Sequence, residues 1–396
     1  MFASGPSSRL SLEDLANDFC EQHGVNISKQ GLHERFNNGA VEFMRALLKE
    51  QLSRQLCCVQ NPELYKHFNS VRIKDSTRYS VPDEYACVYK GQGGIGTPAQ
   101  ISIQYEYDLL EGKTIGLEIT SASRNDQRDS RETLNNIQKR DLLIRDLAYT
   151  SKDYLKHICV NEAFYLNRLN PTWIVLDKKG ERLDFSKILK KLKKYALHLM
   201  ELDVFIPVNN ELLASRLIIS KAADKTYNKR IKKAEKAARS KGYQVTQKFK
   251  TRTSLNMLIT NVPAQWLSSV QVKDAYTLRW QIELVFKVWK SQAQINKVKA
   301  MKIERFQCQL IAKLLWLLLH WQALRAVQQV VNTKCSIWKF YKVASRLSRL
   351  LRQAIVNKKS IQTWIDLIFK KANTKYFTDT KSKRIKTDDI LKTVLA

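Results

Sequence analysis

The hydrophobic residues near the start of the chain recur with helical spacing. Within residues 11–56 this spacing is interrupted once, by a segment that runs from Gly24 to Ser28. Gly is favoured where helices end and Ser where they begin, so the pattern predicts a helix, a short turn and a second helix. Lys29 and Gln30 open the second helix. Helix-turn-helix DNA-binding domains have this layout, but plain helical hairpins share it, and spacing alone does not separate the two.

After these helices the hydrophobic residues alternate with polar ones, as they do in β-strands. Residues 70–82 predict one strand, and residues 99–123 predict a hairpin that turns at Gly112 and Lys113. A short hydrophobic strand that ends at Asp146 follows, and beyond it helical and strand patterns alternate. This order predicts an α/β fold.

Residues 170–255 combine strand-like segments with lysine-dense ones. The strand-like sequences are TWIVLD, DVFIPV and RLIIS, and the lysine-dense sequences are FSKILKKLKKY and KTYNKRIKKAEKAARSKGY. A run of lysines is usually the solvated face of a helix. In a chain this basic it equally suits contact with a phosphate backbone.

The last part of the chain predicts helices. Residues 310–324 are hydrophobic enough for a buried core helix and too short to cross a bilayer comfortably. The tail, residues 373–396, is polar and basic, which predicts partial disorder. The first residues lack the basic start and hydrophobic stretch of a signal peptide, so we expect a cytoplasmic protein without a membrane segment.

The charge of the chain narrows the class of its partner. Lys and Arg number 68 against 37 acidic residues, a formal net charge of +31. Self-repulsion of this size opposes the compact state unless a polyanion balances it, so nucleic acid is the expected partner. The seven cysteines include no CxxC pair, which argues against a disulfide framework or a zinc site and fits a reducing compartment.

Residues 275–292, AYTLRWQIELVFKVWKSQ, lack Gly and Pro and predict a single amphipathic helix. At about 100° per residue, Tyr276, Arg279, Glu283 and Lys290 fall in one stripe roughly 60° wide. Such a stripe is ordinarily a solvated edge with a weak ion pair between Arg279 and Glu283. One carboxylate, two cations and a phenol also suit a phosphodiester held beside a metal ion.

Three carboxylates are candidate metal ligands. Asp75 and Asp146 lie at or near the ends of hydrophobic strands, where an uncompensated charge is costly. Together with Glu283 they would form a cluster of hard oxygen ligands for Mg²⁺ or Mn²⁺, and two such ions about 3.5–4 Å apart support in-line phosphoryl transfer. Trp280 offers a ring on which an unpaired base could stack. These residues indicate a metal-dependent nuclease or a strand-transferase and do not choose between them.

The spacing Tyr276, two residues, Arg279, three residues, Glu283, six residues, Lys290 resembles the Tyr-Arg-Glu-Lys signature of the insertion-sequence family four transposases. IKDST resembles the strand with the family's first aspartate, LLIRDLAY the strand with its second, and MLITNVP the strand before the signature. ISKQGLHERFN resembles its N-terminal DNA-binding segment. The resemblance implies a DDE transposase, named for its two aspartates and one glutamate.

The fold implied by the resemblance is α/β, with a ribonuclease-H-like catalytic core, a β-rich insertion and flanking helical N- and C-terminal regions. The expected divisions are a helical DNA-binding domain at 1–69, the first part of the core at 70–169, the β-rich insertion at 170–255, the second part of the core with the signature helix at 256–332, and a C-terminal helical region with a basic tail at 333–396.

The activity implied by the resemblance is cut-and-paste transposition of an insertion sequence. The enzyme would bind terminal inverted repeats and cut the DNA by way of hairpin ends. It would then transfer the strands to target DNA. The implied metal ligands are Asp75, Asp146 and Glu283, which would hold two Mg²⁺ ions, with Mn²⁺ as a substitute. The expected DNA-binding residues are Tyr276, Arg279, Trp280, Lys290, Lys29 and Gln30.

The implied partners are double-stranded DNA, at the transposon ends and the target, and a second copy of the chain in a homodimer. No membrane and no small-molecule cofactor are expected. The implied location is the bacterial cytoplasm, with association to the nucleoid when DNA is bound. Two alternatives stay open, a catalytically silent DNA-binding repressor derived from a transposase and a structure-selective nuclease that cuts without joining.

Overall fold

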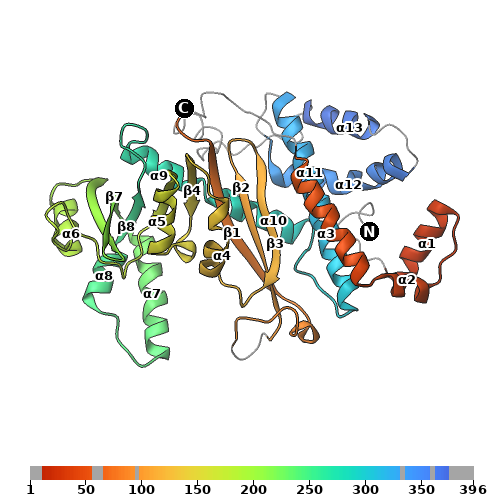
Figure 1. The fold of residues 1–396 in the computed structure, drawn as a ribbon, viewed down its shortest axis with the longest axis horizontal. Coiled ribbons are helices and arrows are strands. Elements are labelled where there is room, and N and C mark those ends of the chain that lie inside the picture. Colours follow the sequence, from red (N-terminus) through yellow and green to blue (C-terminus); the bar gives the residue numbers. More distant parts are fainter. Residues whose placement is uncertain (1–10, 56–65, 94–97, 331–334, 357–361, 374–396) are drawn as a thin grey trace. The chain divides into compact units, whose positions relative to one another are not determined.

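The computed structural model describes residues 11–55, 66–93, 98–330, 335–356 and 362–373. These residues form a mixed α/β structure whose eight strands follow the hydrogen-bonded order β3-β2-β1-β4-β5-β8-β7-β6 (Figure 1). The chain divides into two compact units. Unit 1 holds the described residues up to 55, residues 76–124 and residues from 281 onward, and unit 2 holds the described residues up to 75 and residues 125–280. Strand β1 (Ser70–Ser80) contributes residues to both units.

Three helices open unit 1. They are α1 (Leu12–His23), α2 (Lys29–Arg35) and α3 (Asn38–Ser53). The predicted first helix is confirmed, with Ser11 as its N-cap and Gly24 in the left-handed conformation at its end. The predicted second helix is two helices, because the side chain of Asn37 accepts a hydrogen bond from the backbone of Ala40 at 3.0 Å and caps a new start.

The rest of unit 1 is a hairpin and a group of helices. Its elements are the short 3₁₀ helix η2 (Asp83–Tyr85), β2 (Gln100–Asp108), β3 (Lys113–Ser121), α10 (Trp280–Ser291), α11 (Ile303–Val330), α12 (Ile337–Val356) and α13 (Gln362–Asn373). The predicted hairpin is confirmed: β2 and β3 pair antiparallel, and Gly112 turns between them with a φ of +71°.

The predicted core helix at 310–324 is confirmed as part of α11. Leu314 and Trp316 are at most 1% exposed, and His320 is fully buried. Among the described helices, α11 has the length and hydropathy needed to cross a membrane, and 67% of that stretch is buried inside the protein. Burial of this extent is expected of the core helix of a folded domain. The predicted disorder of the tail concerns residues that, from 374 on, lie outside those described.

Unit 2 is built on a sheet. Besides β1, its strands are β4 (Asp141–Arg145), β5 (Phe164–Arg168), β6 (Met200–Val208), β7 (Glu211–Lys221) and β8 (Leu255–Thr260). β1, β4 and β5 are parallel neighbours, and β8, β7 and β6 continue the sheet antiparallel. The strand predicted at TWIVLD is wrong, since only Leu176 there makes isolated bridges, to Arg182 and Phe205.

Six α-helices and two 3₁₀ helices complete the described part of unit 2. They are α4 (Asp126–Glu132), η3 (Leu134–Asn136), η4 (Leu147–Tyr149), α5 (Lys152–Val160), α6 (Phe185–Lys194), α7 (Asp224–Ser240), α8 (Gln247–Thr253) and α9 (Ser269–Thr277). Residues 170–255, where a β-rich insertion is expected, carry α6, α7 and α8 beside β6 and β7. The lysine-dense segments there are helical because hydrophobic residues recur within them: on α6, Phe185, Ile188 and Leu192 are buried.

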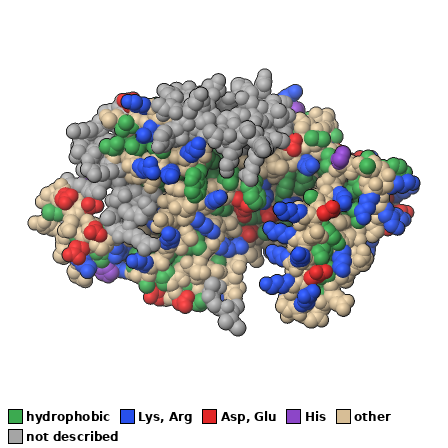
Figure 2. Space-filling model, turned by 180° about the vertical axis from the view of Figure 1, so that it is seen from behind, with side chains coloured by type: hydrophobic (Ala, Val, Ile, Leu, Met, Phe, Trp, Pro, Cys, Tyr) green, Lys and Arg blue, Asp and Glu red, His purple; other side chains and the backbone are tan. Residues whose placement is uncertain are grey.

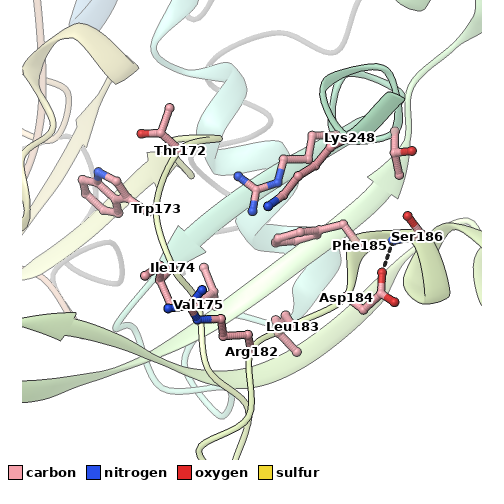
Figure 3. Close-up of a pocket in the computed structure, with 12 residues that line it drawn as sticks. Thr172, Trp173, Ile174, Val175, Arg182, Leu183, Asp184, Phe185, Ser186 and Lys248 are labelled. Atoms are coloured by element: carbon pink, nitrogen blue, oxygen red, sulfur yellow. Dashed lines mark hydrogen bonds between the residues drawn. The ribbon is translucent and has the colours of Figure 1, made fainter. Parts of the chain in front are cut away.

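Basic side chains are abundant on the surface. Figure 2 shows one face, on which Lys and Arg side chains (blue) are more widespread than acidic ones (red). Helix α7 is an example, and its exposed cations are Lys225, Lys229, Lys232, Lys233, Lys236 and Arg239. A cavity of about 380 Å³ lies elsewhere in unit 2. It is lined by the loop after β5, the start of α6 and residues of α8 (Figure 3).

Candidate active site

Two aspartates lie next to each other on neighbouring parallel strands of unit 2. Lys74 of β1 is in register with Arg145 of β4, so Asp75 and Asp146 are the next residues on the two strands. Neighbouring strands are about 4.8 Å apart, which places the two carboxylates at one level of the sheet. The prediction that each lies at or near the end of a strand is confirmed for Asp146, which comes after β4 ends at Arg145. It is wrong for Asp75, which lies inside β1.

Buried ion pairs hold these two strands in place. Lys74 is 3% exposed, and its Nζ lies 2.5 Å from Oδ2 of the fully buried Asp129 in α4. Arg72 donates to Oδ2 of Asp141 at 2.8 Å, so β1 and β4 are also joined through their side chains. Charges buried this deeply require well-placed partners. These buried ion pairs therefore fix the positions of the two strands that carry the aspartates.

Two residues of the signature contact the aspartates. The hydroxyl of Tyr276 donates to Oδ1 of Asp146 at 3.5 Å, and Nη1 of Arg279 donates to Oδ2 of Asp75 at 3.3 Å. Both bonds are long, and therefore weak, for hydrogen bonds in proteins. Unit 2 thus brings together four residues chosen from the sequence, two carboxylates with a phenol and a guanidinium.

The single helix predicted for residues 275–292 is wrong. Helix α9 ends at Thr277 and α10 begins at Trp280. Between them the amides of Leu278 and Arg279 bond to the carbonyls three residues earlier, a tighter 3₁₀-type geometry that interrupts the α-helical hydrogen bonding. The continuous polar stripe therefore does not form. The break instead leaves Arg279 in the connection, within reach of Asp75.

The other two signature residues belong to unit 1. Glu283 lies half-buried in the first turn of α10, and Nζ of Lys290 donates to the carbonyl of Arg78 at 3.2 Å. Burial lowers the pKa of the Lys290 ammonium below its ordinary value. The prediction that Glu283 joins the two aspartates stays a prediction.

The phenol of Tyr276 has a raised pKa and can therefore act as a hydrogen-bond donor. Its burial, and then the nearby charge of Asp146, raise its pKa to about 12, so it keeps its proton at neutral pH. The guanidinium of Arg168 lies 5.8 Å from the centre of the same ring. Arg168 ends β5 and was not chosen from the sequence. The signal available was a cation at the end of the strand that follows the second aspartate.

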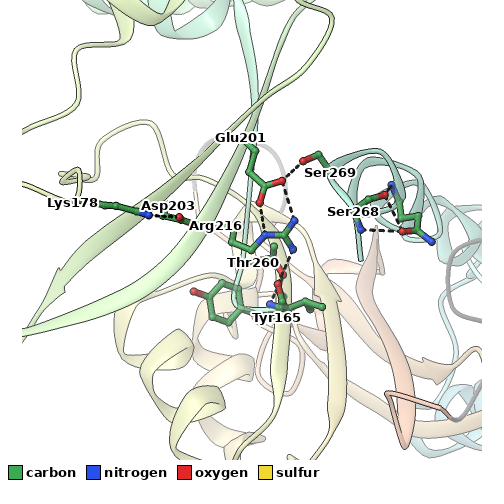
Figure 4. A network of polar contacts seen from close by, with 10 residues as sticks. Tyr165, Lys178, Glu201, Asp203, Arg216, Thr260, Ser268 and Ser269 are labelled. Atoms are coloured by element: carbon green, nitrogen blue, oxygen red, sulfur yellow. Dashed lines mark hydrogen bonds and ion pairs between the residues drawn. The ribbon is translucent and has the colours of Figure 1, made fainter. Parts of the chain in front are cut away.

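A second group missed from the sequence anchors the start of α9. Arg216 of β7 donates to both carboxylate oxygens of Glu201 of β6, at 2.6 and 3.0 Å, and to the carbonyl of Val262 at 2.7 Å (Figure 4). The hydroxyl of Ser269, the first residue of α9, donates to the same Glu201 carboxylate. Arg216 holds the pKa of Glu201 below its ordinary value. The hairpin of the insertion thereby positions the helix that carries Tyr276.

The donor set can be compared with what a divalent metal ion needs. In the described part of the chain, no group of three or more His, Cys, Asp or Glu side chains is gathered around one point. Asp75 and Asp146 nevertheless supply the carboxylate oxygens that Mg²⁺ and Mn²⁺ prefer. The residues fit such ions as a partial site that needs a further ligand.

The remaining predicted DNA contacts lie on the surface. Lys29 and Gln30 are exposed in the first turn of α2, where the Gln30 amide donates to Glu34 at 3.0 Å. Trp280, at the start of α10, is 53% exposed. Their exposure leaves them accessible to a partner, and their roles in DNA binding stay predictions.

Comparisons with known proteins agree on one family. Residues 66–319 match the family model described as a transposase DDE domain. The chain is 30% identical to the transposase for insertion sequence element IS231E of Bacillus thuringiensis subsp. finitimus, over 83% of this chain and 73% of that one. It is 32% identical to the transposase for insertion sequence element IS1151 of Clostridium perfringens, over 78% of this chain and 68% of that one.

The chain also has a distant likeness to solved structures. One of them is a piggyBac transposase synaptic complex with hairpin DNA, at a TM-score of 0.47 and 8% identity over 98% of this chain and 76% of that chain. A likeness this distant supports no argument about the fold or about DNA.

Proposed function

The chain belongs to the transposase DDE domain family, and from this premise we propose that it cuts and joins the ends of a bacterial insertion sequence. The observation that carries the proposal is the contact of Tyr276 and Arg279 with Asp146 and Asp75. The contacts place a phenol and a guanidinium against two carboxylates that lie side by side on β1 and after β4. A phosphodiester held between metal-bound carboxylates and cationic side chains needs all of them.

The proposed metal ligands are Asp75, Asp146 and Glu283. When bound there, two Mg²⁺ ions, or Mn²⁺ in their place, favour in-line displacement at phosphorus because they stabilise the attacking and leaving oxygens. The family acts with divalent ions in general. The number of ions and the role of Glu283 as the third ligand are parts of the proposal.

The other side chains of the site are assigned to the DNA strand. Arg279 presents a planar fork of donors to the non-bridging phosphate oxygens, and Lys290 presents a point charge. Tyr276 donates a proton in a hydrogen bond and does not give it up, because its pKa is about 12. Arg168 adds a further cation beside that ring. Trp280 is exposed, as is needed for stacking a base at the cut end.

The proposed fold of the catalytic core is ribonuclease-H-like. The order β3-β2-β1-β4-β5, with β1, β4 and β5 parallel, supports it. We divide the chain as its sequence suggests, with a helical DNA-binding domain at 1–69, core segments at 70–169 and 256–332, an insertion at 170–255 and a C-terminal region at 333–396. Lys29 and Gln30 are the proposed DNA-reading residues of the first domain.

The proposed setting is the cytoplasm of a bacterium, with the protein on the nucleoid while it is bound to DNA. The partners are the terminal inverted repeats, the target DNA and a second copy of the chain. Hairpin ends are the proposed excision route. The net charge of +31 supports a polyanionic partner of this kind.

The proposal is tested with purified protein and a labelled duplex that carries one end of the element and its flanking DNA. Mg²⁺ should start cleavage at the element boundary, and a chelator should stop it. Asp146→Asn, Asp75→Asn and Glu283→Gln should each lower the cleavage rate at least a hundredfold, while the dissociation constant for the duplex stays within about threefold. Each change removes one charge and keeps the shape of the side chain.

Asp203→Asn is the matched control, because Asp203 is an exposed aspartate whose ion pair is with Lys178. It should cut like the unchanged protein. Specific binding without cleavage by any variant would establish the repressor alternative, and cleavage without joining to target DNA would establish the nuclease. Full activity of Glu283→Gln would remove Glu283 from the site.

A further inference from the structure

Two buried polar side chains, those of Asn167 and Thr150, lie next to Asp146 and have no part in the chemistry described above. Asn167 belongs to β5 and is fully buried, and Thr150 follows η4 and is 4% exposed. Asn167 is in register with Arg145, the last residue of β4 and the one before Asp146. All of these residues lie in unit 2.

Their hydrogen bonds hold the backbone on both sides of Asp146. The hydroxyl of Thr150 donates to the carbonyl of Asp146 at 3.2 Å. The side-chain amide of Asn167 donates to the hydroxyl of Thr150 at 2.6 Å and, more weakly, to the carbonyl of Arg145 at 3.4 Å. The carbonyl before the α-carbon of Asp146 and the carbonyl after it are therefore both held by this pair of side chains.

The carboxylate of Asp146 is tied to the same stretch of backbone. Its Oδ1 accepts a hydrogen bond from the backbone N–H of Leu147 at 2.8 Å, beside the longer one from Tyr276. A carboxylate that is bonded to its own backbone changes direction when that backbone moves. The pair that holds the two carbonyls therefore also holds the direction of the carboxylate.

Stability alone does not explain a buried asparagine at this position. The two residues before it in β5, Tyr165 and Leu166, are fully buried. Oδ1 of Asn167 is also buried, and it has no hydrogen-bond partner among the described residues. A buried oxygen without a donor is costly, and a hydrophobic side chain of similar size would avoid that cost. What only the asparagine supplies is the amide that donates to Thr150.

We propose that Asn167 and Thr150 are positioning residues for metal binding. They hold the backbone of Asp146 so that its carboxylate stays beside that of Asp75, where the metal ion is proposed to bind. The inference rests on the proposed function, in which Asp146 is a metal ligand. Removal of a group that orients a metal ligand through hydrogen bonds typically lowers metal affinity about 10–100-fold.

The test measures metal binding by the full chain without DNA, so it does not depend on cleavage. Mn²⁺ is titrated into the protein, and the free ion is counted from its electron paramagnetic resonance signal. Asp146→Asn shows how much of the binding belongs to the proposed site. Thr150→Val keeps the shape of the side chain and removes the hydroxyl, so Mn²⁺ affinity should fall roughly tenfold. Thr150→Ser keeps the hydroxyl and should bind Mn²⁺ as the unchanged protein does.

A double variant separates positioning from stability. Thr150→Val with Asn167→Leu replaces both polar partners by hydrophobic side chains and removes the buried oxygen that lacks a donor. Such a paired change can leave the free energy of unfolding nearly unchanged, which urea denaturation measures. We expect the double variant to be about as stable as the unchanged protein and to bind Mn²⁺ roughly tenfold more weakly. Recovery of Mn²⁺ affinity together with stability would overturn the inference.

Thr260→Val is the matched control, because Thr260 is a buried threonine of unit 2 that also makes two hydrogen bonds. Its hydroxyl donates to the carbonyl of Tyr165 at 2.6 Å and accepts from the N–H of Val262 at 3.1 Å. This variant should lose about as much stability as Thr150→Val and keep its Mn²⁺ affinity. An equal loss of Mn²⁺ affinity in the two variants would contradict a specific role for Thr150.

Two further outcomes distinguish this inference from the proposed function. If Asp146→Asn loses Mn²⁺ binding and Thr150→Val does not, the inference is overturned and the proposed metal site stands. If Asp146→Asn binds Mn²⁺ as tightly as the unchanged protein, the proposed metal site is wrong and the inference falls with it.

Discussion

Lys74 shows how one residue can prepare a site without taking part in its chemistry. It directly precedes Asp75, and its ammonium lies against Asp129 and also donates to the hydroxyl of Thr133 at 3.2 Å. A charged pair in a dry interior stabilises little by itself, but breaking it leaves an uncompensated charge. The pair therefore fixes the position of β1 directly before Asp75, the proposed metal ligand.

Replacing Lys74 should destabilise the protein strongly. Lys74→Met leaves the fully buried Asp129 without its cation, at an expected cost of about 3–5 kcal/mol in the free energy of unfolding. Urea denaturation measures it. The double variant Lys74→Met with Asp129→Leu should recover most of the loss, and Lys139→Gln, in an exposed pair with Glu162, should change stability by less than about 1 kcal/mol. Equal effects at the two pairs would contradict the argument.

Tyr276, in contrast to Lys74, is a residue that we propose to act on the reaction itself. Tyr276→Phe removes only the hydroxyl that contacts Asp146, so we expect cleavage of the element end to slow by about threefold, equivalent to one weak hydrogen bond of roughly 0.5–1 kcal/mol. In the unchanged protein, the phenol of Tyr276 should stay protonated below pH 10, because its pKa is about 12. Its ionisation should therefore not lower the cleavage rate in that range. A rate of Tyr276→Phe equal to that of the unchanged protein would remove the hydroxyl from the mechanism.

At the scale of elements, α11 contains a polar residue that its hydrophobic sequence does not explain. His320 is fully buried between the rings of Trp316 and Trp364, and its Nδ1 lies 2.8 Å from the carbonyl of Trp316. Its Nε2 has no hydrogen-bond partner among the described residues. Burial lowers its pKa to about 4, so the ring is neutral in the folded protein at physiological pH.

This histidine should make the protein sensitive to acid. Its pKa falls from the ordinary 6.5 to about 4 on folding, so below pH 6.5 the unfolded chain takes up a proton that the folded chain refuses. The contribution of His320 to the free energy of unfolding is fully present above pH 6.5 and is lost as the pH falls to 4. It amounts to about 3 kcal/mol. In urea titrations at pH 7 and 4.5, His320→Leu should lose less stability than the unchanged protein. The control His198→Gln, at an exposed position, should lose as much stability between pH 7 and 4.5 as the unchanged protein does.

The break between α9 and α10 shows what an element boundary contributes. A continuous helix would have kept Arg279 on the same stripe as Glu283. In the structure the α-helical hydrogen bonding is interrupted at Leu278 and Arg279, and the guanidinium donates to Asp75. The hydrophobic pattern passes through the interruption unchanged, because both helices bury the residues that flank it, among them Ala275, Leu278 and Ile282. Periodicity therefore could not locate the break.

At the scale of the whole molecule, the excess of 31 positive charges governs association with DNA. Binding releases counterions from the phosphates, so the logarithm of affinity should fall linearly with the logarithm of salt concentration. With roughly 6–10 phosphate contacts, affinity for any duplex should drop about 10³–10⁵-fold between 50 and 200 mM salt. Fluorescence anisotropy on a duplex without the element end measures the slope.

The exposed lysines of α7 should account for part of that slope. Lys232→Gln with Lys236→Gln removes two of them and should lower the slope by about two, with little change in stability. An unchanged slope would show that this helix points away from bound DNA.

Sequence alone determined the features that depend on neighbours along the chain. Helix caps at Ser11 and Gly24, the hairpin at Gly112, and the strands that carry Asp75 and Asp146 follow from local spacing and backbone preference, and the structure confirms them. The signature spacing identified the family, which the comparisons support. Such features are readable because each is decided within a few residues.

Only the tertiary structure decided which side chains meet. The register of β1 and β4 placed Asp75 beside Asp146, and the interruption after α9 left Arg279 in contact with Asp75. Arg168, and the network of Glu201 with Arg216, were invisible beforehand because their partners lie far away in sequence. The energy of a long-range contact depends on distance and burial in the folded chain, and neither is written in the order of the residues.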